Sequence, residues 1–142
     1  MKLHIITIGQ PKLDYAQKGW AEYWKRLEHY HQVRVTHVAD KHNDADHILA
    51  TAGSSYKLGL VIEGEEFTSL ELAAFLEKRA LDGREVSCII GGPDGLPQAV
   101  LDQLDYRWSL GKLTLPHDLA MVVLLETLYR ASTINANQPY HR

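Results

Sequence analysis

The sequence alternates short apolar runs with longer amphipathic segments, and this alternation constrains the fold more than any other feature. The apolar runs have the length of β-strands and are rich in Val, Ile and Leu. They cover residues 3–8, 33–38, 58–62, 86–90 and 108–110. Because strands separated by helices pair in parallel, the pattern predicts an α/β fold: a mostly parallel sheet with helices on both faces.

The segments between the runs carry the signals of helices. Apolar residues recur at steps of three and four. Thr68 or Ser69 can cap a helix whose end Gly83 follows, and Gly53 follows the end of another. Helices are expected over residues 13–30, 44–52, 69–81, 97–104 and 117–136. With no repeat and no linker, residues 1–142 are expected to form a single domain.

The last predicted helix is apolar on nearly all sides, so it must be buried on nearly all sides. Two explanations stay open. The helix lies at the centre of one chain, or its extra face is covered by a second copy.

Charge and composition exclude several classes of protein. The net charge of −3 argues against a general nucleic-acid coat, which carries a basic field, but allows contact with RNA through one local patch. The single cysteine, Cys88, lies in an apolar run and is expected to be a buried thiol of a reducing compartment. No apolar run reaches the ~20 residues of a membrane span, so a soluble, cytoplasmic protein is expected.

Two loops follow predicted strands, where open α/β sheets bind their ligands. The first, Gly91–Gly95, has three glycines in five residues but matches neither the Rossmann nor the P-loop motif, so a structural turn and a cofactor loop both stay open. The second, Ser109–His117, is mostly apolar and either packs into the core or covers a flat ring such as adenine. The eight histidines show no metal motif, so no metal site is expected.

Several segments resemble a known family when they are taken together. They occur over the whole chain and in the family's order: Ile62-Glu63-Gly64, Gly91–Gly95, Trp108-Ser109-Leu110, Leu113–His117, Glu126–Ala131 and Pro139–Arg142. In this the chain is similar to the ribosomal RNA large subunit methyltransferase H family of the SPOUT (α/β-knot) superfamily. The resemblance implies transfer of a methyl group from S-adenosylmethionine to N3 of a pseudouridine in 23S rRNA of the assembled ribosome. It also implies a C-terminal trefoil knot and a homodimer in which two copies complete each site.

The resemblance also implies roles for single residues. The cofactor-binding residues would be Leu60, Gly92, Gly111, Lys112, Leu113, Thr114, Leu115 and Pro116. The catalytic residues would be Arg130, Tyr140 and His141, with His141 or a neighbour accepting or stabilising the N3 proton and Arg130 holding a phosphate or the developing negative charge.

The chain departs from the family at three places. Asp94 replaces a glutamate, Gly111 replaces a serine, and Ala120-Met121 stands where an arginine is usual. The last change lowers the positive charge near the site. It leaves a second interpretation open, a non-catalytic α/β nucleotide-binding or ribosome-associated module.

Overall fold

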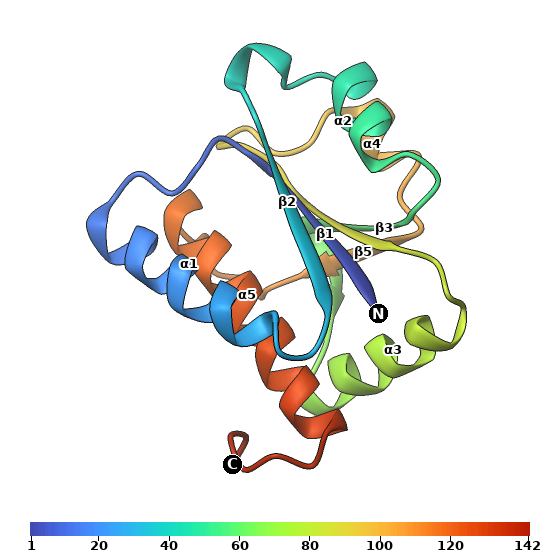
Figure 1. The fold of residues 1–142 in the computed structure, drawn as a ribbon. Coiled ribbons are helices and arrows are strands. Elements are labelled where there is room, and N and C mark those ends of the chain that lie inside the picture. The colour runs from blue at the N-terminus through green and yellow to red at the C-terminus, as the bar shows by residue number, and fades with distance from the viewer.

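The five strands form one sheet in which every neighbouring pair is parallel. The computed structural model describes all 142 residues, and the strand order is β2-β1-β4-β3-β5 (Figure 1). The strands are β1 (Lys2–Ile8), β2 (Gln32–Val38), β3 (Tyr56–Glu66), β4 (Val86–Ile90) and β5 (Tyr106–Ser109). The predicted parallel α/β fold is confirmed, and all five carboxyl ends lie at one edge of the sheet.

Helices cover both faces of this sheet, as the sequence predicts. They are α1 (Asp14–Leu27), α2 (Ala45–Ala52), α3 (Ser69–Leu81), α4 (Gln98–Leu101) and α5 (His117–Asn135), with a 3-10 turn, η1 (Asp40–His42), before α2. Helices α1, α3 and α5 lie on one face, and α2 and α4 lie on the other (Figure 1). None of these helices is both long and apolar enough to cross a membrane.

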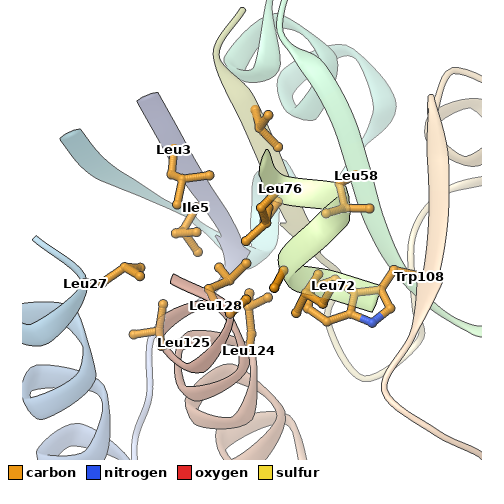
Figure 2. Close-up of a cluster of buried hydrophobic side chains, with 14 residues drawn as sticks. Leu3, Ile5, Leu27, Leu58, Leu72, Leu76, Trp108, Leu124, Leu125 and Leu128 are labelled. Carbon is orange, nitrogen blue, oxygen red and sulfur yellow. The ribbon is translucent and has the colours of Figure 1, made fainter. Parts of the chain in front are cut away.

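Helix α5 forms the centre of the larger core. Its Leu124, Leu125 and Leu128 are fully buried and belong to a cluster of 14 residues that joins α1, α3 and the sheet (Figure 2). No residue from 117 to 134 is classed as exposed. The burial expected from its apolar composition is therefore largely achieved within one chain, although about half of the helix is only partly covered.

A smaller core of seven residues lies under α2 and α4. It packs Ile48 of α2 and Val100 of α4 against Ile6, Ile8 and Ile89 of the sheet. On the opposite face Cys88 is fully buried, which confirms its predicted burial, and this burial raises the pKa of its thiol to about 12.

Local capping signals fix where helices begin and end. Thr68 accepts a hydrogen bond from the Glu71 backbone N–H at 3.1 Å, and Glu71 accepts one from the Thr68 N–H at 2.8 Å, which completes a capping box. Asp44 caps α2 by accepting from the His47 backbone N–H, and Gly53 ends that helix at a φ of 58°.

Two predictions about elements are wrong. The strand expected over residues 58–62 continues to Glu66. Its second half is not buried, and Ile62 is 68% exposed, because the pairing with β4 ends at Leu60 and only β5 lies beside the rest of the strand. The helix expected over residues 97–104 covers only Gln98–Leu101. It ends early because the N–H groups of its last turn bond three residues back, the tighter 3-10 pattern.

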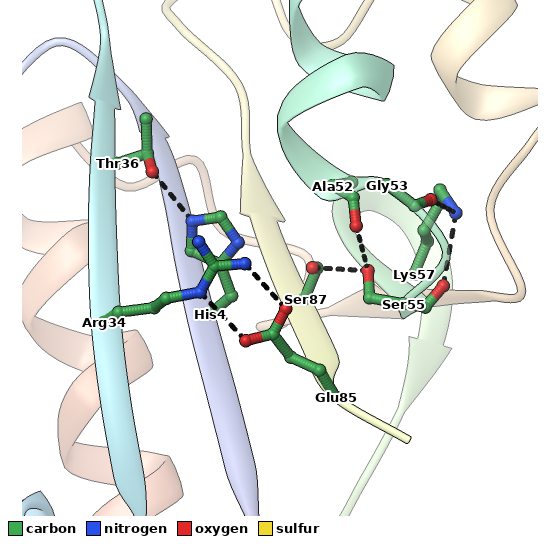
Figure 3. Close-up of polar contacts among 9 residues, drawn as sticks. All are labelled: His4, Arg34, Thr36, Ala52, Gly53, Ser55, Lys57, Glu85 and Ser87. Carbon is green, nitrogen blue, oxygen red and sulfur yellow. Dashed lines mark hydrogen bonds and ion pairs between the residues drawn. The ribbon is translucent and has the colours of Figure 1, made fainter.

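Polar side chains occupy the sheet near the amino ends of its strands (Figure 3). His4 is fully buried and its Nε2 lies 2.8 Å from the Thr36 hydroxyl, while Arg34 makes two hydrogen bonds to the Glu85 carboxylate. These contacts lie at the edge opposite the carboxyl ends. The candidate ligand loops therefore gather elsewhere.

Candidate functional site

The segment between β5 and α5 crosses the carboxyl edge of the sheet. It leaves β5 at Ser109 and enters α5 at His117, whose Nε2–H donates to the carbonyl oxygen of Ile8 at 2.8 Å. Ile8 ends β1, and β4 and β3 lie between β1 and β5. With strands ~4.8 Å apart, residues 110–116 span roughly 14 Å over the ends of two strands.

The glycine loop after β4 also lies against Ile8, at the carboxyl end of β1. A Cβ at Gly92 would lie 3.4 Å from Cγ2 of Ile8, the residue that His117 also contacts. The loop closes on itself, with the Gly95 N–H donating to the Gly92 carbonyl at 2.9 Å. The two loops that the sequence singled out therefore converge at the carboxyl end of β1.

Asp118 fixes the position of this crossing segment. Its Oδ2 accepts hydrogen bonds from the backbone N–H groups of Lys12 at 2.8 Å and Leu13 at 2.7 Å. The carboxylate also lies in the first turn of α5, where the helix dipole favours negative charge. Sequence reasoning treated Asp118 only as a helix start, because its partners are about a hundred residues away in the chain.

The predicted cofactor residues after β5 form a turn with little cover. The Ser109 hydroxyl accepts from the Gly111 N–H and donates to the Gly111 carbonyl, each at 3.1 Å, and Gly111 has a φ of 130° that disfavours any side chain. Leu113 is 83% exposed. An exposed apolar side chain is suited to contact with a flat apolar ligand.

A cavity of about 440 Å³ opens where β3 runs past the end of β5. It is lined by Ile62, Glu63, Gly64, Glu65, Glu66, Ser109 and Lys112. Its lining carries three carboxylates and one ammonium group, so the net charge of the lining is negative and favours a cationic ligand. Of the predicted cofactor residues only Lys112 lines it, whereas Leu60 lies just before the point where β3 leaves β4.

Sequence reasoning assigned no role to Glu65 and Glu66 and cited Glu63 only in a family segment, because the strand was expected to end at Ile62, before all three. Their place follows from Gly64: a Cβ there would lie 2.8 Å from the Arg107 carbonyl carbon and oxygen, closer than real contacts allow. This close approach brings the end of β3 over β5 and its acidic side chains beside Lys112.

The three predicted catalytic residues do lie together, around Glu126. Arg130 forms an ion pair with Glu126 at 2.8 Å, and the Tyr140 hydroxyl donates to the same carboxylate at 3.0 Å. The Arg130 guanidinium also lies over the Tyr140 ring, 4.7 Å from its centroid, and its Nη1 donates to His141 Nδ1 at 3.2 Å. Glu126 thus positions the tail on α5.

These contacts set the protonation of the cluster. Burial, followed by hydrogen bonding to Tyr23 and Glu126, raises the pKa of Tyr140, so its hydroxyl remains a donor. The hydrogen bond to Glu126 raises the pKa of Arg130. Because a guanidinium can only donate, Nδ1 of His141 must accept, and the ring proton of the neutral imidazole is then on Nε2.

One chain does not bring the two halves of the predicted site together. Arg130 follows His117 by thirteen residues in the same helix, which places them roughly 20 Å apart. In Figure 1 the C-terminal tail lies at the end of α5 away from the carboxyl edge of the sheet. The cofactor loops and the Arg130–Tyr140–His141 cluster are therefore separate in a single copy.

Known proteins share both the sequence and the fold. A family model described as "Predicted SPOUT methyltransferase" matches residues 1–141. The chain is 52% identical to the ribosomal RNA large subunit methyltransferase H of Deinococcus radiodurans, over 100% of this chain and 99% of that one. It is 48% identical to the protein of the same name from Deinococcus deserti, over 100% of both.

Solved structures agree on the fold. The alignment with a methylase-family protein from Neisseria gonorrhoeae covers 99% of this chain and 85% of that protein's chain, at a TM-score of 0.59 and 11% identity. The alignment with a methylase-family protein from Haemophilus influenzae covers 99% of this chain and 70% of that protein's chain, at a TM-score of 0.55 and 14% identity. With a family model over nearly the whole length and relatives near half identity, the chain belongs to the SPOUT methyltransferase family.

Proposed function

We propose that this methyltransferase uses S-adenosylmethionine to methylate N3 of a pseudouridine in 23S rRNA of assembled ribosomes in the cytoplasm. The observation that carries the proposal is the crossing of residues 110–116 over the carboxyl ends of β3 and β4, next to Gly92. This is the edge at which α/β sheets bind ligands. The names of the two Deinococcus relatives support ribosomal RNA as the substrate.

The residues at this edge fit the cofactor. S-adenosylmethionine joins an adenosine to a sulfonium and an amino-acid part, and it supplies an activated methyl group when it is bound. Leu113 and the backbone of residues 111–116 would contact the adenine and ribose, and Gly92 would allow close approach of the backbone. The carboxylates of Glu63, Glu65 and Glu66 would attract the positive charges.

The C-terminal cluster would act on the RNA. Arg130 would hold a phosphate or the charge that develops on the pyrimidine, and this would loosen its pair with Glu126. While Nδ1 of His141 accepts from Arg130, its Nε2–H is a donor that stabilises a negative oxygen or nitrogen. His141 becomes a base only after that bond breaks. Positioning of the two reactants supplies much of the rate.

A homodimer would complete the site. Because Arg130 lies roughly 20 Å along α5 from His117, where the crossing segment ends, the cluster of one copy would approach the loops of the other. The partly covered residues of α5 leave room for a second copy. The trefoil knot belongs to the same proposal and rests on the family resemblance, since chains almost never thread themselves.

The decisive experiment transfers labelled methyl groups from the cofactor to intact ribosomes and maps the modified base. Label on a pseudouridine of 23S rRNA is expected. Label on protein, or on no component of the ribosome, would refute the substrate assignment. Mixing inactive His141→Ala chains with inactive chains defective in cofactor binding should restore partial activity if each site uses two copies.

Calorimetry separates the enzyme from the alternative, a non-catalytic ribosome-associated module. Wild-type protein and the His141→Ala variant should bind S-adenosylmethionine with similar affinity, while the variant loses methylation. The exposed His29 provides a matched control, because its replacement by alanine should change neither. Absence of cofactor binding by the wild-type dimer would favour the non-catalytic module.

A further inference from the structure

Two histidines and an aspartate gather directly after β2, where η1 leads into α2. The side chains are His42, Asp44 and His47, and one ligand atom from each lies within 4.8 Å of the other two. The spacing His-x-Asp-x-x-His is not a helical metal motif, so the sequence alone predicts no metal site here. The fold of the turn creates a cluster that the spacing alone does not reveal.

The geometry of the cluster is compact. Nδ1 of His47 lies 2.8 Å from both carboxylate oxygens of Asp44. The imidazole rings of His42 and His47 stack with their centroids 4.1 Å apart and an angle of 23° between the planes. Two imidazoles beside a carboxylate are the donor set that zinc and neighbouring first-row metals prefer, whereas calcium and magnesium prefer oxygen alone.

Backbone hydrogen bonds hold the carboxylate in place. Asp44 Oδ1 accepts from the His47 backbone N–H at 2.9 Å, and the Asp44 N–H donates to the His42 carbonyl at 2.8 Å. These two bonds orient the oxygen ligand.

We propose that His42, Asp44 and His47 bind one divalent transition-metal ion, with Zn²⁺ the best match. Tetrahedral zinc holds its ligand atoms about 3.3 Å apart, so the widest pair, now within 4.8 Å, must close by at most about 1.5 Å. The contact between His47 Nδ1 and Asp44, now 2.8 Å, must open by about 0.5 Å if Nδ1 is the ligand atom, and its proton then moves to Nε2. His47 is exposed and His42 is partly exposed, so rotation of these side chains supplies that movement. The fourth position remains open to water.

Helix capping alone does not account for the cluster. A cap explains the bonds between Asp44 and His47, but the ring of His42 contributes nothing to it. The turn also supports the glycine loop: Asn43 Nδ2 lies 3.7 Å from where a Gly92 Cβ would stand, and Asn43 Oδ1 is buried without a partner. A bound ion would stiffen the turn on which that loop rests.

The test measures metal binding directly, independently of methyl transfer. Metal-free full-length protein is titrated with Zn²⁺ by calorimetry, and with Co²⁺ while visible absorption is recorded. One ion per chain and the intense absorption of tetrahedral cobalt are expected. No saturable binding up to millimolar metal would overturn the proposal.

Variants assign the ligands. His42→Ala and Asp44→Asn should each weaken zinc binding by at least about tenfold. Asparagine caps a helix as well as aspartate does, so Asp44→Asn should keep the far-ultraviolet circular dichroism of the wild type. His29→Ala, at an exposed histidine outside the cluster, should bind as the wild type does. Wild-type affinity in His42→Ala, or an equal loss in His29→Ala, would place the ion elsewhere and refute the assignment.

Discussion

Replacing Asp118 by alanine should destabilise the protein through two backbone groups that lie far away in the sequence. Asp118 is 9% exposed, and its Oδ2 accepts from the N–H groups of Lys12 and Leu13. Each N–H left without an acceptor costs about 1–3 kcal/mol. Lys12 and Leu13 are themselves exposed, so water can reach these groups, and the lower half of the range applies. Loss of the negative charge at the start of α5 costs about 0.3–1 kcal/mol more, which brings the expected loss in unfolding free energy to roughly 3 kcal/mol.

Urea denaturation at one fixed protein concentration measures this loss, because the proposed dimer would make the stability depend on concentration. With a slope of about 2 kcal/mol per molar urea, the midpoint should fall by roughly 1.5 M in Asp118→Ala. Asp118→Asn keeps the shape and one acceptor oxygen, and it should lose only about 1 kcal/mol. An alanine variant as stable as the asparagine variant would refute the reasoning, because the two hydrogen bonds would then contribute nothing.

The anchoring also has a consequence for the proposed function. Asp118 directly follows the segment that crosses the carboxyl edge, so the alanine variant should bind S-adenosylmethionine more weakly than Asp118→Asn does. Calorimetry at a temperature where both variants remain folded gives this comparison. Equal affinities would show that the hydrogen bonds of Asp118 stabilise the fold without shaping the cofactor site, and would contradict this prediction.

Three further predictions concern other parts of the chain. Thr68→Ala removes a helix cap and should cost about 1 kcal/mol in urea denaturation, and an unchanged midpoint would contradict it. Burial, together with the positive N-terminus, lowers the pKa of His31 from 6.5 to about 4. As the pH falls from 6.5 to 4, the unfolded chain therefore binds a proton at His31 before the folded chain does. The free energy of unfolding should fall by about 2 kcal/mol over this range, after a discount for the partial exposure of the ring. His31→Gln should flatten that dependence, whereas replacing the exposed His29 should not. Gly64→Ala forces a Cβ to within 2.8 Å of the Arg107 backbone. The variant should lose about 1–3 kcal/mol of stability and bind the cofactor more weakly. A variant as stable as the wild type that binds the cofactor normally would refute the close approach.

The sequence alone predicts the elements because their signals are local. The five apolar runs become the five parallel strands, and Thr68, Asp44 and Gly53 cap or end helices through contacts only a few residues away. The resemblance to the family, which is confirmed, depends in the same way on short segments in a fixed order. The predicted boundaries fail most at Glu66, where pairing with β5 extends β3, and at Leu101, where local 3-10 hydrogen bonds replace the last turn of the helix.

The tertiary structure decides which residues meet, because the contacts of the site join distant parts of the chain. His117 reaches Ile8, Asp118 reaches Lys12, and Gly64 approaches Arg107, each across a separation that no periodic pattern records. The fold also separates residues that the family resemblance groups together, since a rigid helix holds Arg130 roughly 20 Å from His117, where the crossing segment ends. Strand order and helix length fix these distances, and both are set by packing of the whole chain.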